Sequence, residues 1–174
     1  RCTSRGLGDV YKRQDHGRHA HRLGADPRLA HLLTRSVELE AAYPGAVATA
    51  CLLAAALADR DLLRGRRRPV DLRLRLDALL GTRRDDADPQ ALRLARDSAR
   101  RWERRLGASD TAAADLDLAG LLTSVAFPDR IARRRDDGGS FLLASGAGVA
   151  IDPDDGIARH QWLAVAETEG VGAD

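Results

Sequence analysis

The sequence predicts an α+β fold in which a bundle of α-helices leads into the start of a small β domain. Two observations carry this prediction. Apolar residues recur at helical spacing between Asp26 and Ala126, and after Gly138-Gly139 they occur in short runs separated by Gly, Pro and Asp. Apolar residues make up 44% of the 174 residues, a share that argues against disorder along the whole chain.

The first segment, residues 1–14, is excluded from this prediction. It holds the only lysine of the chain, Lys12, and its polar pattern has no period. The segment resembles translated sequencing-adapter sequence, and the alternative is a genuine disordered terminus. We therefore expect the folded region to begin at residue 15.

Residues 15–107 are predicted to form the helical bundle. The first helix begins near Asp26, whose carboxylate can cap the first turn, and Pro27 suits the first helical position. The chain breaks at Pro44-Gly45, and a second helix follows over about 46–58. Because this second helix is apolar on nearly all sides, we expect it to lie at the centre of the bundle.

Two further helices are predicted in the bundle. Residues 71–77 alternate between leucine and polar residues as a strand does, but Pro69 before them and the leucines that lead to Gly81 favour a helix. Residues 89–106 give the clearest helix, because their apolar residues are spaced by three and four in turn and form one stripe. Gly107 is expected to end it.

A polar linker over 108–115 is predicted to separate the bundle from residues 116–174. This last part begins with a helix over about 117–126, which Pro128 closes. Short strands bounded by turn residues should follow. They are expected at 141–145, 148–152 and 162–167. Three strands make an unfinished sheet, so we expect the native protein to continue beyond Asp174.

The arginines supply the best functional signal. The 28 basic and 26 acidic residues give a net charge of +2, which is too small to predict nucleic-acid binding by itself. Arg96, Arg100 and Arg104, however, recur every four residues on one helix face, where like charges repel. Such a row is tolerated if it meets phosphates, or if nearby acids neutralise it. A second group lies where the helices give way to strands: Arg133, Arg134 and Arg135.

Other kinds of site are not supported. The sequence has no GxxxxGK[ST] phosphate loop and no acidic magnesium motif, so no catalytic, cofactor-binding or metal-binding residue is predicted. His16, His19 and His21 cluster as zinc or nickel ligands can, but no Cys or carboxylate completes a site, and a solvated incidental cluster is favoured. Two cysteines do not support a disulfide framework, which suits a reducing cytoplasm. The longest apolar stretch is too short to span a membrane.

Five segments follow one another in a characteristic order: DPRLAHLL at 26–33, AAALADRDLLRG at 54–65, DLRLRL at 71–76, the arginine-rich helix ending at Leu106-Gly107, and AFPDRIARRR at 126–135 with the strands after it. In this order they resemble the HrpB family of bacterial DEAH-type ATP-dependent helicases. The resemblance covers residues 15–174, and it is the order of the segments, more than any one of them, that makes coincidence improbable.

This resemblance implies that the chain is an accessory, non-catalytic region: a helical "ratchet" domain and the start of an OB-like domain. Two RecA-like motor domains in the same polypeptide would bind ATP and magnesium. The expected partner is a single nucleic-acid strand, with RNA favoured and DNA left open, contacted at its phosphates by the two arginine groups. Two alternatives stay open at this point: a free-standing nucleic-acid-binding adaptor, and a structural or protein-interaction domain whose arginine face is incidental.

Overall fold

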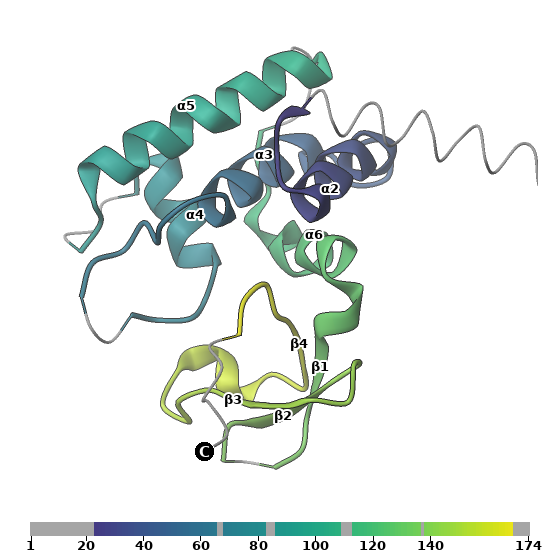
Figure 1. Ribbon diagram of the computed structural model, residues 1–174, viewed down its shortest axis with the longest axis vertical. Helices are drawn as coiled ribbons and strands as arrows, with labels where there is room; N and C mark the ends of the chain where they lie inside the picture. The colour runs from purple at the N-terminus through teal and green to yellow at the C-terminus, as the bar shows by residue number, and fades with distance from the viewer. Residues whose placement is uncertain (1–22, 66–67, 83–85, 109–112, 137, 169–174) are drawn as a thin grey trace, which may run out of the picture.

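The computed structural model describes residues 23–65, 68–82, 86–108, 113–136 and 138–168. Within these ranges five α-helices lie together, and a four-stranded antiparallel sheet lies at one end of them (Figure 1). The predicted α+β class is confirmed. Residues 1–14 and the histidine cluster at 16–21 lie outside the described residues.

The predicted helices are present, with slightly different bounds. They are α2 (Pro27–Leu39), α3 (Ala46–Leu57), α4 (Arg73–Leu80), α5 (Pro89–Leu106) and α6 (Ala119–Ala126). The Asp26 carboxylate caps α2 by accepting the Arg28 backbone N–H, and Asp88 caps α5 in the same way. Gly81 and Gly107 end α4 and α5 in the left-handed conformation that glycine adopts without strain.

Helix α3 is the centre of the bundle, as its uniformly apolar sequence predicts. It packs against α2, α4, α5 and α6, and ten of its residues are buried. The α5 stripe that faces it ends in Trp102, whose side chain is 6% exposed. The indole N–H of Trp102 donates to the Leu23 carbonyl at 3.0 Å, so this aromatic ring is both packed and hydrogen-bonded.

Helix α6, which follows the segment predicted as a linker at 108–115, packs on α2 and α3. Leu122 on α6 is fully buried in the same apolar core as α2 and α3. The chain before it is held against α3, because the Thr49 hydroxyl accepts the Asp115 N–H at 2.9 Å and donates to the Asp115 carbonyl at 3.0 Å. Packing changes from the core of the helices to the small core of the sheet only after Phe127.

The sheet contains β1 (Ile131–Arg134), β2 (Ser140–Leu143), β3 (Gly148–Ala150) and β4 (Trp162–Ala164), in the order β3-β2-β1-β4. The three predicted strands are present but shorter than expected. Strand β1 was not predicted, because only Ile131 and Ala132 precede a run of arginines and no alternating pattern forms. It is nevertheless central, and Ala132 on its inner side is fully buried beside Phe141.

The junction between bundle and sheet is a clamp around Phe127. The guanidinium carbons of Arg28 and Arg130 lie 5.3 and 5.2 Å from the centroid of its ring, within the range of cation–π attraction. Arg28 also binds the Asp129 carboxylate, and Arg130 donates to the Ala166 carbonyl. These contacts join α2, the 3₁₀ turn η2 (Pro128–Arg130) and the segment after β4.

Candidate nucleic-acid interface

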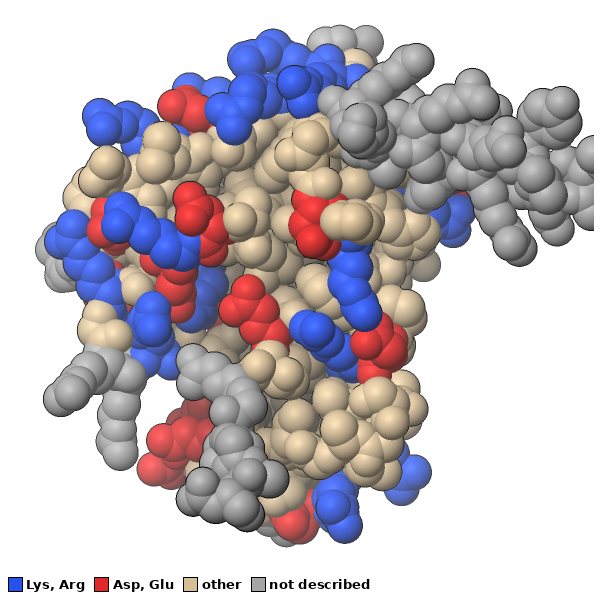
Figure 2. Space-filling model, in the orientation of Figure 1, with Lys and Arg blue, Asp and Glu red and all other residues tan. Residues whose placement is uncertain are grey.

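The first predicted group of arginines lies on α5. The inner side of this helix is buried on the bundle, and its other side faces solvent at the edge of the molecule (Figure 1). Figure 2 shows basic side chains gathered along that edge. The sequence therefore placed this row correctly on the outer part of a packed helix, but its three members do not have equal surroundings.

Arg96 is used within the fold. Its Nε donates to the Leu79 carbonyl and its Nη2 to the Ala78 carbonyl, both at 2.8 Å. These carbonyls belong to the last turn of α4, where the helix itself supplies few N–H donors, and the Ala78 carbonyl also accepts the Gly81 N–H at 3.3 Å. The half-buried guanidinium therefore caps α4 and fixes it against α5, and its donors on these carbonyls are not offered to an outside phosphate.

Arg100 and Arg104 are exposed, and among the residues that the structure describes neither forms a hydrogen bond or an ion pair. Arg96 and Arg100 border an open hollow of about 430 Å³ between α3, α4 and α5. Glu103 also lines this hollow and brings one negative charge to its wall. Of the three arginines in the predicted row, Arg100 and Arg104, one turn apart, are thus the two whose guanidinium groups are available.

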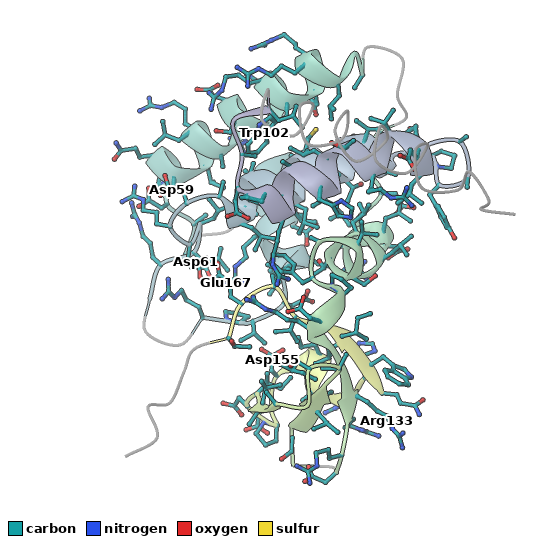
Figure 3. All side chains as sticks on the ribbon, turned by 45° about the vertical axis from the view of Figure 1, so that its right-hand side comes forward. Asp59, Asp61, Trp102, Arg133, Asp155 and Glu167 are labelled. Carbon is teal, nitrogen blue, oxygen red and sulfur yellow. The ribbon has the colours of Figure 1, made fainter. Side chains whose placement is uncertain are left out.

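The second predicted group lies on and just after β1. Arg133 is exposed on the outer face of the sheet, Arg134 is half-buried and donates to the Arg159 carbonyl at 3.2 Å, and Arg135 is exposed beyond the strand. Figure 3 places Arg133 at the end of the molecule opposite Trp102 of α5. The structure therefore does not bring the two groups together: they form separate basic surfaces.

Many other arginines are neutralised by carboxylates. The described part of the chain contains seven ion pairs, and none of them involves Arg96, Arg100, Arg104, Arg133 or Arg135. The most buried pair joins Arg75 and Asp61 at 2.8 and 3.1 Å. Burial raises the pKa of Asp61, but the hydrogen bonds from Arg75 and the Leu63 N–H outweigh it, and the pKa lies below its usual value. Part of the high arginine content of this chain therefore serves ion pairs within the fold and not binding.

The sequence also led to expectations about the two cysteines and about metal ligands. Cys51 is a free thiol buried on α3, and burial raises its pKa, which makes it a poor nucleophile. Cys2 lies outside the described residues. Within the ranges that the structure describes, no three His, Cys, Asp or Glu side chains are grouped as metal ligands.

Sequence reasoning missed Trp162. The sequence assigned it to a strand, but the side chain is 58% exposed on the outer face of the sheet, next to Arg133. The alternation of Leu163 and Val165 toward the small sheet core was the available signal, because it turns Trp162 to the opposite face.

No protein-family profile matches the chain. The ATP-dependent RNA helicase HrpB of Escherichia coli K12 is 48% identical over 50 residues, which are 29% of this chain and 6% of the helicase. A crystal structure of the E. coli DExH-box NTPase HrpB matches with a TM-score of 0.67 and 31% identity, over 91% of this chain and 17% of that one. A second, of the E. coli DEAH/RHA helicase HrpB, matches with a TM-score of 0.61 and 32% identity, over 84% and 16%. Matches this extensive include both the helices and the sheet.

Proposed function

We propose that this HrpB-like fragment of a DEAH-type helicase is an accessory region that holds a single nucleic-acid strand beside the motor of the enzyme. The observation that carries the proposal is the structural match, which spans 91% of this chain but 17% of the solved helicase. Most of such a helicase therefore has no counterpart in this sequence. The activity of the whole protein is assigned to those other parts.

Arg100 and Arg104 are the residues that we assign to the strand on the α5 face. Both are exposed, and both keep their charge without a carboxylate partner among the described residues. Cations of this kind bind phosphates, which are present at every nucleotide whatever the base. The contact would therefore give affinity without sequence specificity, as a moving helicase requires. RNA is the proposed strand.

ATP and magnesium are assigned to RecA-like motor domains of the same polypeptide. The sequence has no phosphate loop, and the residues present do not fit a nucleotide site, so no step of ATP hydrolysis is placed on this chain. Across the described residues, no helix combines the length and the apolar character needed to cross a membrane. We propose a cytoplasmic location.

The proposal is tested by measuring how the 174-residue chain binds a labelled single-stranded RNA at several salt concentrations. Each phosphate contact should contribute a slope of about −0.7 to the dependence of log affinity on log salt. Arg100→Gln with Arg104→Gln should make the slope less steep by about 1.4, because two such contacts are lost.

Arg35→Gln is the matched control. Arg35 is an exposed helix arginine like the other two, but it is already paired with Glu38, so its loss should leave the slope unchanged. Absence of binding by the unmodified chain at low salt would contradict the proposal. That result would favour a structural or protein-interaction role for the arginine face.

A further inference from the structure

Three side chains from neighbouring strands form a row across the outer face of the sheet. The register of β1 sets Arg133 opposite Trp162 of β4 on one side and opposite Leu142 of β2 on the other. Residues directly opposite each other in a sheet project from the same face. The inner face is turned toward a separate small core around Phe141. We call Leu142, Arg133 and Trp162 the outer row.

The outer row exposes two large apolar side chains next to a cation. Trp162 is 58% exposed and Leu142 44%, and Trp162 has the largest exposed fraction among the large hydrophobic side chains of the described residues. The other tryptophan, Trp102, is 6% exposed and hydrogen-bonded. An exposed indole beside an exposed leucine is the kind of surface patch that marks a binding site.

The pairing geometry brings the cation close to the indole. In the ladder between β1 and β4, hydrogen-bonded and non-hydrogen-bonded residue pairs alternate. The Arg134 N–H donates to the Gln161 carbonyl at 2.9 Å, and the Val165 N–H donates to the Arg130 carbonyl at 3.1 Å, so these two pairs are of the hydrogen-bonded type. Arg133 and Trp162 are therefore a non-hydrogen-bonded pair, the type in which facing side chains lie nearest, with Cβ atoms about 5 Å apart.

The charge of Arg133 is not neutralised on this face. The remaining outward strand positions carry no acidic residue: they are Ile131, Ser140, Gly148, Ala150 and Ala164. Within the described ranges, the side chains of Arg133 and Trp162 have no hydrogen-bond, ion-pair or ring partner. The row thus presents one free cation and one free aromatic face side by side.

We propose that the outer row is a base-stacking site for a single nucleic-acid strand, in which Trp162 stacks on a base and Arg133 contacts an adjacent phosphate. This inference rests on the proposed function. Aromatic stacking combined with a backbone-contacting cation is how proteins bind single strands without reading sequence. A protein partner that covered Leu142 and Trp162 would have to bring a carboxylate placed to pair with the buried Arg133 charge, whereas a nucleic-acid strand carries a phosphate next to every base.

The site is distinct from the α5 arginines, because Arg133 and α5 lie at opposite ends of the molecule (Figure 3). A strand bound to both would be held at two places. The α5 contact involves phosphates alone, whereas the outer row needs exposed base faces. This difference in chemistry lets the two contacts be tested separately.

The test compares two probes of equal length and charge: a single-stranded oligouridylate and an oligomer with the same phosphates but no bases. We expect the 174-residue chain to bind the probe with bases about tenfold more tightly, the size of one stacking contact. Trp162→Ala should abolish this preference, and Trp162→Phe should keep most of it. Binding of the oligouridylate should also quench the tryptophan emission, and Trp162→Phe, which leaves only buried Trp102 emitting, should lose that quenching.

Arg133→Gln should reduce the salt slope by about 0.7 and leave the preference for bases largely intact. Because both side chains are exposed, the variants should retain the circular dichroism and Tm of the unmodified chain, which excludes misfolding as the cause. An unchanged base preference in Trp162→Ala, or unchanged emission on binding, overturns the stacking site. If Arg100→Gln still weakens binding in that case, the proposed function stands without it. If the unmodified chain binds neither probe, both proposals are wrong.

Discussion

Arg28 and Asp129 are 101 residues apart in the sequence and are joined by two hydrogen bonds of 2.6 and 3.1 Å across the junction of bundle and sheet. One guanidinium thus binds both oxygens of one carboxylate while it also lies over the Phe127 ring. Bidentate geometry makes this exposed pair more specific than a typical surface ion pair. The pair joins α2 to the turn that leads into the sheet.

This pair predicts a pH-dependent junction. The hydrogen bond from Arg28 lowers the pKa of Asp129, so the pair stabilises the fold above the usual aspartate pKa of about 3.9 and ceases to do so as pH falls through the lowered value. Asp129→Asn should therefore lower the Tm at neutral pH, and the difference from the unmodified chain should disappear in strong acid. Asp154→Asn is the control, because among the described residues that carboxylate binds no arginine. A difference in Tm that persisted at pH 2 would contradict the assignment.

Arg96 and Arg100 should give opposite results although they are one turn apart on α5. Arg96→Gln removes two hydrogen bonds to the end of α4 and should cost about 2 kcal/mol in urea unfolding, with little change in RNA affinity. Arg100→Gln should change stability by less than about 0.5 kcal/mol and weaken RNA binding. If Arg96→Gln instead left stability intact and weakened binding as much as Arg100→Gln, its capping role would be wrong.

The helices were predictable because local signals determine their ends. Asp26, Asp88 and the glycines at 81 and 107 act within one turn of the helices that they begin or end. Strand β1 lacked such a signal, because Ala132 is the one apolar residue on its inner side and its stability comes from two neighbouring strands. The packing of α6 was also missed, since it depends on contacts with α2 and α3, which are distant in sequence.

The candidate interface was predictable in position but not in detail. Spacing alone put Arg96, Arg100 and Arg104 on one face, yet it could not reveal that two carbonyls of α4 lie within reach of Arg96. The role of Trp162 depends on which face of the sheet is covered, and the burial of Phe141 and Ala132 decides that. The Arg96 contacts are tertiary and no helical period contains them, whereas the alternation of Leu163 and Val165 already indicated the side of the strand on which Trp162 lies.

Gly45 should tolerate no side chain. Its φ is 89°, and a Cβ built there would lie 2.4 Å from the Ala113 carbonyl oxygen, at the close approach of the α6 segment to α3. Gly45→Ala should therefore cost about 3 kcal/mol or more in unfolding free energy, from backbone strain and the clash together. Gly65 also has a positive φ, of 105°, but a Cβ built there would meet no atom within 4 Å. Gly65→Ala should therefore cost about 1 kcal/mol in unfolding free energy. Equal costs at the two sites would show that Ala113 moves away freely.

Arg75 should be the arginine whose loss destabilises the bundle most. Its side chain is 10% exposed, binds both Asp61 oxygens, and donates to the Pro69 and Asp71 carbonyls at 2.6 and 3.1 Å, so it holds the loop between α3 and α4. Arg75→Met should cost about 3 kcal/mol in urea unfolding, because it leaves the Asp61 carboxylate with less neutralisation in a partly buried place. Adding Asp61→Asn should restore part of that loss, since the unpaired charge is then removed. Additive costs in the double variant would mean that the two side chains act independently, contrary to the paired geometry.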